Sequence, residues 1–497
     1  MAGCTSAIVI NKAEEIVNAD TGDLYILETI ASLNWPSAGR VDMVNSHLPA
    51  MAPTAGRQLA YRLAIPAAAL GVYGLFALLW QSGAHSAYFG ALRFLGVAPF
   101  SFPFLDVDAV LSAAECGRQG VDIYISNPCD ALGRPHVYSP VWTALVPGFL
   151  GKSARGWVGL SLGLMFILSW GLLLRPRSAQ AMLVFGMAAL SPMTVYALER
   201  ANNDIVVFLL ILCGGILSIA ARSYRLCAYP LYLAAGLLKY YPLVLLMLLA
   251  RERCRDAVIG IIASGALLIL SGVYFRADLG RALTNIPAAS YFADSFSAEN
   301  LPFGMGEALS NGVGRNLIAF LLLAGLTAVA IARMVRTIRL LEPERLDRNE
   351  TEAQYLVIGG MLVTACFFAG QNINYRGIYL LLVLPGLVRL HELCGEGAVR
   401  RFYRQMIGAV LFVMWEECVR HILHNLVAPG TSQGLSSPAE VFFWLGRELV
   451  WWWMIAGLAA LVVSYLRRLP LLQNGTARSA ACERPLEDAL GQPQADG

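Results

Sequence analysis

Residues 256–275 read DAVIGIIASGALLILSGVYF and follow RERCR at 251–255. A helix needs roughly 20 mostly apolar residues to cross the hydrocarbon core of a bilayer, which is about 30 Å thick. The run at 256–275 has that length, contains one charged residue and has three arginines directly before it. The sequence therefore predicts a membrane-spanning helix whose arginine-rich end lies on one side of the bilayer.

Similar runs recur through the 497 residues, of which 57% are hydrophobic and 14% charged, against about 25% charged in ordinary soluble domains. We predict an all-α, polytopic integral membrane protein with about 11–12 transmembrane helices. Two predicted spans are irregular, because 138–151 is short and 226–250 contains Pro230 and Pro242. The predicted spans are residues 59–81, 138–151, 157–174, 179–198, 204–221, 226–250, 256–275, 315–333, 354–370, 375–390, 404–424 and 441–466.

Polar segments flank the predicted transmembrane domain, which covers 58–468. Residues 1–57 lack a basic start followed by an apolar stretch and a cleavage site, so no secretory signal is predicted. We expect a cytoplasmic extension there, with Met43 and Met51 as alternative start sites closer to the first span. Residues 469–497 are expected to form a disordered cytoplasmic tail.

Arginine clusters orient the spans, since positive residues beside spans stay preferentially in the cytoplasm. With the N-terminus inside, the clusters at 251–255, 333–348, 400–404 and 467–468 are all cytoplasmic. This orientation leaves outside the segments 82–137, 276–314, 371–374 and 425–440. Four arginines would then lie outside against the rule, namely Arg175, Arg177, Arg222 and Arg225. We expect a multi-pass protein of the inner (plasma) membrane of the cell.

Charge and cysteine usage give no indication of nucleic-acid binding or of a thiolate metal site. The net charge of +3 gives no reason to expect nucleic acid as a partner. The cysteines lack the spacing of a thiolate metal site. Cys116 and Cys129 share one polar loop and could pair if this loop faces an oxidising compartment, although pairing cannot be read from sequence alone.

The loop at 82–137 is rich in acidic, aromatic and turn-forming residues. Asp106 and Asp108 precede a helix-like stretch, where aspartate is a common N-cap. Two carboxylates close to a membrane surface also suit a general base or a metal site that holds a phosphate ester. Further candidate sugar or phosphate contacts, which are equally typical of turns, are Asp122, Tyr124, Asn127 and Asp130.

The order of motifs resembles the GT-C membrane glycosyltransferases, and within them glycosyltransferase family 87. The matching elements are Asp106, the small residues Ala113 and Ala114, the sequence GVDIY at 120–124, and Tyr-Ser-Pro at 138–140. The resemblance covers roughly residues 59–395. Its later motifs are LERANNDIVVFLLIL at 198–212, GLLKYYPLVLL at 236–246 and NINYRGIYLLLVLPGL at 372–387. Ala201 stands where the family pattern has glycine.

The resemblance implies a GT-C-like helical bundle that transfers a mannose-like hexose. The implied donor is a polyprenyl-phosphate sugar, and the acceptor is a lipid or glycan at the outer face of the membrane. Asp106 is the implied catalytic base, with Asp108 as the second catalytic candidate. A carboxylate can take the proton of the attacking hydroxyl, and substitution of Asp106 is expected to change stability little. No metal ligands are assigned, and a divalent cation is the one cofactor left open.

Other residues are predicted to bind substrate. Lys239 lies inside an apolar run, where an ionisable residue defaults to a functional hypothesis, and we expect it to bind the donor phosphate; snorkelling or pairing with a buried carboxylate is the alternative. Arg376 could clamp phosphate or anchor a span end. His421 shares a helical face with Glu417 and His424, which suits simple pairing, the sugar site or a metal. The remaining candidates are Asp122, Tyr124, Tyr138, Asn203, Asp204 and Tyr240.

A transporter or flippase of lipid-linked glycans is the main alternative, because charged residues within spans also mark substrate pathways. The sequence shows no internal repeat and has a large polar first loop. Both features favour the transferase.

Overall fold

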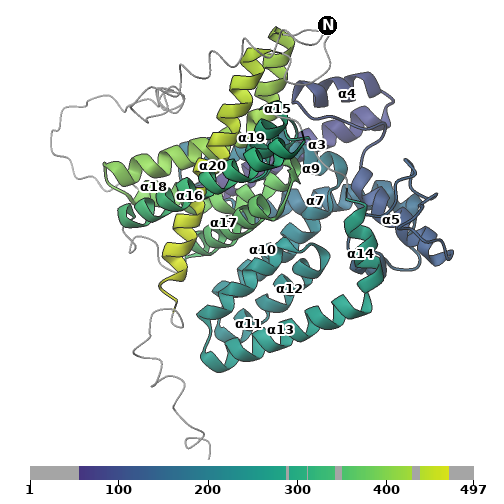
Figure 1. Cartoon of the computed structure of the whole chain (residues 1–497), viewed down its shortest axis with the longest axis horizontal. Coiled ribbons are helices and arrows are strands. Elements are labelled where there is room, and N and C mark those ends of the chain that lie inside the picture. Colours follow the sequence, from purple (N-terminus) through teal and green to yellow (C-terminus); the bar gives the residue numbers. More distant parts are fainter. Residues whose placement is uncertain (1–54, 287–289, 310–311, 342–349, 428–436, 470–497) are drawn as a thin grey trace, which may run out of the picture. The chain divides into compact units, whose positions relative to one another are not determined.

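The structure is a computed structural model that describes residues 55–286, 290–309, 312–341, 350–427 and 437–469. The chain divides into two compact units, 1–51 and 52–497, and the described residues belong to the second. They form an all-α fold with a single pair of short strands (Figure 1), as predicted. Most of the predicted extension at 1–57 and tail at 469–497 lies outside the described residues.

The elements alternate between long apolar helices and short connecting ones. The long helices are α3 (Ala55–Gln81), α7 (Arg155–Leu173), α10 (Asn203–Ile219), α13 (Cys254–Tyr274), α16 (Val313–Leu340), α17 (Thr351–Ala369), α19 (Ala398–Val427) and α20 (Pro438–Leu466). The shorter ones are α4 (His85–Phe94), α5 (Leu105–Arg118), α6 (Pro140–Leu145), α8 (Ala179–Ala189), α9 (Pro192–Arg200), α11 (Arg222–Leu226), α12 (Ala228–Leu238), α14 (Arg276–Thr284), α15 (Asn300–Leu309) and α18 (Leu380–Leu393). Three 3₁₀ helices, η1 (Lys152–Ala154), η2 (Tyr241–Arg251) and η3 (Asn374–Tyr379), and the strands β1 (Ser295–Phe296) and β2 (Asn372–Ile373) complete the set.

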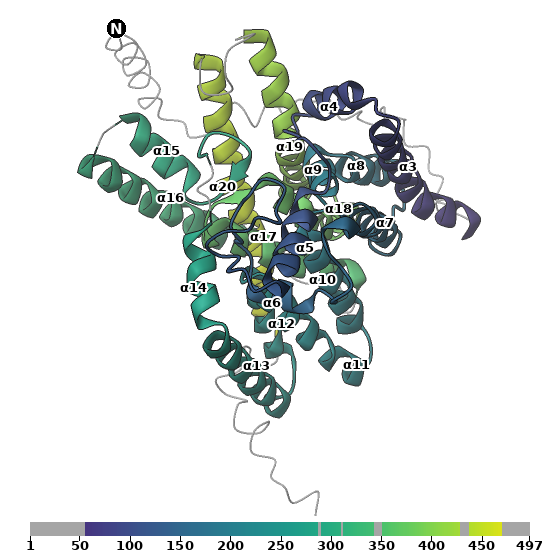
Figure 2. The same ribbon diagram turned by 90° about the vertical axis from the view of Figure 1, so that its right-hand side faces the viewer.

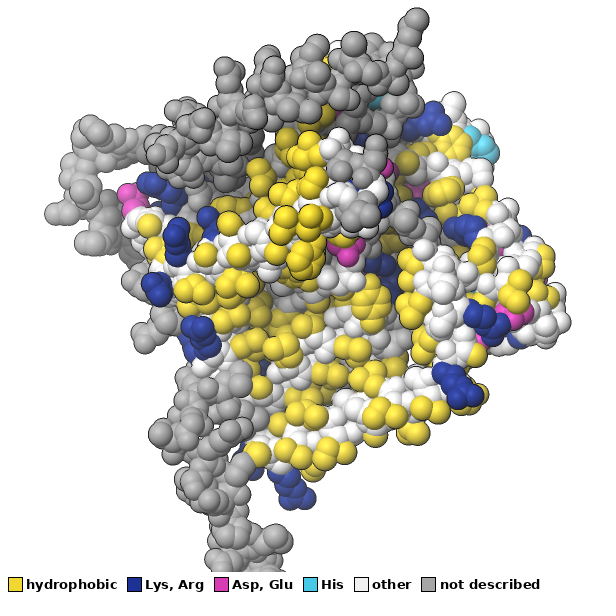
Figure 3. Space-filling model, viewed as in Figure 1, with side chains coloured by type: hydrophobic (Ala, Val, Ile, Leu, Met, Phe, Trp, Pro, Cys, Tyr) yellow, Lys and Arg dark blue, Asp and Glu magenta, His cyan; other side chains and the backbone are white. Residues whose placement is uncertain are grey.

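Six described helices are long and apolar enough to cross a membrane, namely α3, α7, α13, α16, α17 and α20. The pair α8 and α9, bent by 45°, makes a seventh span if it is counted as one. α17 and α20 are mostly buried, whereas α13 exposes large apolar side chains such as Ile261, Ile262 and Ile269. Figure 3 shows apolar side chains over the middle of this face, with lysines and arginines gathered toward its edges. The protein is therefore a multi-pass membrane protein.

Two of the predicted spans are wrong. Each of the two errors changes the side of the membrane assigned to the residues that follow it, so the two changes cancel after residue 250. The segment 138–151 does not span, because its only α-helix, α6, has six residues. The segment 226–250 is not one span but a hairpin, in which α12 leads in one direction and η2 returns. The Tyr229 hydroxyl donates to the Leu248 carbonyl oxygen at 3.0 Å, and Gly236 packs closely against Leu243, so the two limbs are antiparallel.

The loss of the span at 138–151 removes the conflict over the four arginines, and the hairpin keeps the cluster at 251–255 on the same side as they are. Arg225 pairs with Glu252 at 2.7 Å, and Arg251 donates to the Ser218 carbonyl oxygen at 3.2 Å. Arg225 therefore lies at the same end of the helices as the cluster at 251–255. Arg177 pairs with Glu352 at the start of α17 at 2.9 Å, directly after the cluster at 333–348. The orientation of the arginines thus obeys the positive-inside rule more fully than the sequence indicated.

The opposite end of the helices gathers the loops that were predicted to lie outside. The Phe104 amide donates to the Glu199 carbonyl oxygen at 2.7 Å, which fixes the start of α5 to the end of α9. β1 and β2 pair antiparallel and join the segment around 295 to that around 373. Figure 2 shows α5 and α6 in front of the helical bundle from this side.

Cysteine labelling tests this topology. Ser126 lies in the first loop and Ser223 in α11, and both are exposed. In a protein that keeps only Cys116 and Cys129, we expect a membrane-impermeant maleimide to label Ser126→Cys in intact cells and Ser223→Cys only after permeabilisation. Labelling of Ser223→Cys in intact cells would mean that α12 and η2 do not form a hairpin in the membrane.

Candidate active site

The polar motif at 198–204 forms the junction between α9 and α10. α9 ends at Arg200, and Ala201 adopts the left-handed conformation with φ 42°. Glycine takes this conformation without the steric cost that alanine has, which explains why the family pattern has glycine here. The Asn202 side chain then caps α10 by accepting from the Asp204 amide at 2.8 Å. The junction therefore presents Arg200, Asn202 and Asp204 at one place.

Asp106, in the first turn of α5, is held by this junction. Neither Asp106 nor Asp108 is the N-cap, which is Phe104. Arg200 donates to both carboxylate oxygens of Asp106, at 2.9 and 3.0 Å, and the Asn202 amide donates to one of them. The Tyr138 hydroxyl donates to the other at 3.3 Å. Asp106 is 1% exposed. Its surroundings are thus those of a buried ion pair.

These contacts set the charge of Asp106. Burial alone would raise the pKa of this carboxyl group, but the Arg200 charge and the hydrogen bonds from Arg200 and Asn202 bring it below its ordinary value. Asp106 is therefore a carboxylate at neutral pH and can accept a proton. The expectation that its substitution changes stability little does not hold, because removal of one partner of a buried ion pair leaves the other uncompensated.

A cavity of about 750 Å³ opens beside Asp106. Its polar wall carries four cations, Arg134, Arg200, Lys239 and Arg376, and two carboxylates, Asp106 and Asp130. Its apolar wall comes from α13 and α14 and includes Leu268, Phe275, Leu279 and Leu283. The cavity therefore joins a positively charged region to an apolar surface.

Asp204 does not line the cavity but forms ion pairs with two of these cations. Lys239, at the turn of the hairpin, donates to Asp204 at 2.6 Å, and Arg376 lies 3.6 Å from the same carboxylate. The hydroxyls of Tyr241 and Tyr379 also donate to Asp204. Lys239 is 8% exposed. Lys239 thus lines the cavity and also pairs with a buried carboxylate, which was the alternative interpretation of this residue.

The predicted site residues divide into two groups. The cavity is lined by predicted residues that lie far apart in the sequence, namely Asp106, Asn127, Asp130, Tyr138, Lys239, Tyr240 and Arg376. The others do not line it: Asp108, Asp122, Tyr124, Asn203, Asp204 and His421.

The residues outside the cavity have other contacts. Asp108 pairs with Arg155 at 3.2 Å. Asp122 pairs with Arg281 of α14. His421 contacts Asn425 at 3.0 Å. Their predicted roles in catalysis or substrate binding remain predictions.

Sequence reasoning left several cavity residues unassigned. Arg200 donates to both carboxylate oxygens of Asp106, yet 94 positions separate the two residues. A buried arginine between two apolar runs was the only sequence signal for it. Arg134 and His136 also line the cavity, and they stood in a loop whose composition fits turns equally well.

Metal-ligating residues do not gather within the described ranges: no group of three or more His, Cys, Asp or Glu side chains there could hold a metal ion. His424 lies 2.7 Å from Glu440, and Glu417 pairs with Arg420. His421, His424 and Glu417 therefore have separate partners rather than one shared centre.

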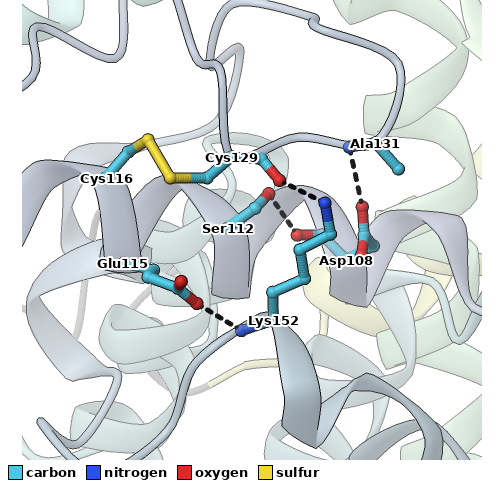
Figure 4. The surroundings of a disulfide bond; sticks show 7 residues. All are labelled: Asp108, Ser112, Glu115, Cys116, Cys129, Ala131 and Lys152. Atoms are coloured by element: carbon cyan, nitrogen blue, oxygen red, sulfur yellow. Dashed lines mark hydrogen bonds between the residues drawn. A yellow bond between two sulfur atoms is a disulfide. The ribbon is translucent and has the colours of Figure 1, made fainter.

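A disulfide bond joins Cys116, near the end of α5, to Cys129 (Figure 4). The Lys152 ammonium donates to the Cys129 carbonyl oxygen at 2.8 Å, and the Ala131 amide donates to Asp108 at 3.4 Å. The segment from 127 to 138, which forms one wall of the cavity, is thus tied to α5 by the disulfide and Asp108 and to η1 by Lys152. The pairing left open by the sequence is present in the structure.

The disulfide should stabilise the cavity wall. For Cys116→Ser with Cys129→Ser we expect a loss of about 3 kcal/mol of unfolding free energy, as chain-entropy estimates give for a loop of this size. Thermal unfolding in detergent measures this loss. The free cysteines Cys213 and Cys227 are exposed, so the Cys213→Ser, Cys227→Ser protein is the control and should unfold like the wild type. Equal unfolding temperatures for all three proteins would mean that the bond does not constrain the loop.

Comparison with known proteins gives one family match. Residues 137–368 match glycosyltransferase family 87. No curated protein and no solved structure shows significant similarity to the chain. The matched range includes Tyr138, Lys239 and Tyr240, whereas Asp106 and Arg376 lie outside it on either side. The chain is thus similar to glycosyltransferase family 87 over residues 137–368, and this match favours a transferase over a transporter.

Proposed function

We propose that this glycosyltransferase is a hexosyltransferase that uses a polyprenyl-phosphate sugar as donor. The acceptor is a hydroxyl group of a lipid or glycan at the outer face of the plasma membrane. One observation carries the proposal: a single cavity contains the Asp106 carboxylate, a set of cations and an apolar wall. A donor made of a sugar, a phosphate and an isoprenoid chain needs all three.

The apolar wall suits the isoprenoid chain. Leu268 and Phe275 face the cavity, while other residues of α13 such as Ile262 and Ile269 are exposed on its surface. In a bilayer these exposed side chains would contact acyl chains, so α13 lies between the lipid and the site. An isoprenoid can therefore leave the bilayer beside α13 while it stays in apolar surroundings.

The cations suit the phosphate. Lys239 and Arg376 both face the cavity and share one counter-ion, Asp204. Two positive charges against one negative charge leave an excess that can neutralise phosphate oxygens. The guanidinium of Arg376 offers a planar fork of donors and Lys239 a compact charge. This pair would also stabilise the negative charge that grows on the phosphate as it leaves.

The reaction then follows from Asp106. The acceptor hydroxyl oxygen attacks the anomeric carbon, and the bond from this carbon to the phosphate oxygen breaks. The bonding electron pair stays with the phosphate, and the hydroxyl proton passes to the Asp106 carboxylate. Each Asp106 oxygen already accepts two hydrogen bonds, of which that from Tyr138, at 3.3 Å, is the longest. The acceptor hydroxyl would replace Tyr138 at this oxygen.

Transfer by the purified protein tests the proposal. We expect a labelled hexose to pass from polyprenyl phosphate to a membrane-lipid or glycan acceptor and not from a nucleotide-activated hexose. Transfer from the nucleotide sugar alone would refute the donor class. Movement of the labelled lipid across a vesicle membrane without bond formation would instead indicate a flippase.

A further inference from the structure

One wall of the cavity carries polar groups that the proposed reaction does not use. Asn127 and His136 both line the cavity and are 1% and 2% exposed. The Asn127 side-chain oxygen has no hydrogen-bond partner within the described part of the chain. Neither ring nitrogen of His136 has a partner of ordinary hydrogen-bond geometry there, although the Ser139 backbone is close enough to act on the ring. Such groups are few in native proteins, because a buried polar atom without a partner loses its hydrogen bonds to water and gains none in return. Their position together on one cavity wall indicates that a ligand completes them.

The segment that carries these groups is held in place by contacts along its length. The His136 amide donates to the Ile123 carbonyl oxygen at 2.8 Å. Arg134 forms two side-chain bonds to Asp130, at 2.8 and 3.1 Å. Together with the disulfide at Cys129, these contacts hold the segment at both ends. The open donors and acceptors therefore belong to a rigid surface.

The chemistry of these atoms specifies the ligand. The His136 ring lies between the rings of Tyr124 and Tyr138, with centroids 5.6 Å away in each case. Burial lowers the pKa of His136 to about 4, with small opposing contributions from the Ser139 backbone and Asp130, so the ring is neutral at physiological pH. A neutral imidazole offers one donor and one acceptor, and the Asn127 oxygen offers a second acceptor.

This set suits hydroxyl groups and not a phosphate. A hydroxyl both donates and accepts, so it can satisfy a ring nitrogen of either kind and the Asn127 oxygen. A phosphate oxygen only accepts, and it would leave both acceptors unpaired. The position agrees with a sugar, because Tyr138 contacts the His136 ring on one side and Asp106 on the other.

We infer that Asn127 and His136 form a hydroxyl subsite, which binds hydroxyl groups of the donor's sugar ring and selects among hexoses. The inference rests on the proposed polyprenyl-phosphate donor and adds to it the residues that recognise the sugar. Lys239 and Arg376 would bind the phosphate whichever sugar is attached. The hydroxyl subsite alone would then distinguish hexoses that differ in the orientation of one hydroxyl.

Binding of two lipids separates recognition of the sugar from recognition of the phosphate. The probes are polyprenyl-phosphate mannose and polyprenyl phosphate, and their affinities are compared for wild type, His136→Phe and Asn127→Leu. We expect both variants to bind the sugar-loaded lipid about ten- to a hundredfold more weakly than wild type and to bind the bare lipid equally well. His391→Phe is the matched control, because His391 lies in the last turn of α18 and does not line the cavity. This variant should bind both lipids as the wild type does.

Donors that lack single hydroxyls provide a second measurement, in which the loss caused by the missing hydroxyl is compared with the loss caused by the variant. For at least one deoxy position, kcat/KM of the wild type should fall, and His136→Phe should cause no further fall with that donor. Equal weakening of both lipids by His136→Phe, or additive losses at every deoxy position, would overturn the inference and leave the donor class intact. A wild type that binds neither lipid would overturn the proposed donor, and the inference with it.

Discussion

Asp106→Asn is expected to lower the rate of transfer by about 10²- to 10⁴-fold, which corresponds to roughly 3–5 kcal/mol of activation free energy. The amide keeps the shape of the carboxylate but cannot take the proton of the acceptor hydroxyl. Unfolding free energy should also fall by about 3–5 kcal/mol, because Arg200 is left in a buried site without its counter-ion. Single-turnover transfer and thermal unfolding of the same preparation measure the two effects.

Asp108→Asn is the matched control for this experiment. Asp108 is a buried carboxylate of the same helix with its own arginine partner, Arg155, and it does not line the cavity. We expect Asp108→Asn to lose stability while the folded enzyme keeps its single-turnover rate. An inactive Asp108→Asn beside an active Asp106→Asn would move the base to Asp108, and activity in both variants would rule out this mechanism.

Lys239→Ala is expected to raise the KM for the donor by about 10- to 100-fold, because it removes a charged hydrogen bond to the phosphate. Lys239→Arg should raise this KM less, since a positive charge remains. In the alanine variant Asp204 keeps Arg376 at 3.6 Å as its only described cationic partner within 4 Å, so the excess of positive charge disappears. Initial rates at varied donor concentration give the KM of each variant.

A comparison of two inhibitors, one with and one without the phosphate, provides the control. Polyprenol has the same chain without the phosphate, and inhibition by polyprenol should be equal for wild type, Lys239→Ala and Lys239→Arg. Polyprenyl phosphate should inhibit the alanine variant more weakly than the wild type. If polyprenol inhibition weakened as much as polyprenyl phosphate inhibition, Lys239 would support the cavity rather than bind the phosphate.

The all-α membrane fold could be predicted because apolar run length and arginine clusters act over short stretches of sequence. The hairpin of α12 and η2 could not, since 226–250 has the length of one span and its limbs are too short to be recognised separately. Pro242 stands at the start of η2, and Lys239 at the turn marks the one place where the apolar pattern breaks. These two residues were visible as irregularities, but the reversal of direction depends on packing against α10 and α17.

The candidate site was predictable where one residue type carries the signal. A lysine within an apolar run and an aspartate in a loop next to the membrane stand out, which is why Lys239 and Asp106 could be named. Arg200 and His136 owe their roles to contacts, since the first neutralises Asp106 and the second lies between two aromatic rings. Sequence reasoning cannot supply such contacts between distant segments.

The reversal at Lys239 also determines how deep in the bilayer the donor must bind. α12 has 11 residues, which rise about 17 Å at 1.5 Å per residue, roughly half of a 30 Å hydrocarbon core. The cavity extends along α13 from Leu268 to Phe275, or about 10 Å of helix. A donor whose phosphate reaches Lys239 must therefore sink below the headgroups of its leaflet. The surrounding lipid would form a dimple around the enzyme, and bilayer thickness would become a determinant of turnover.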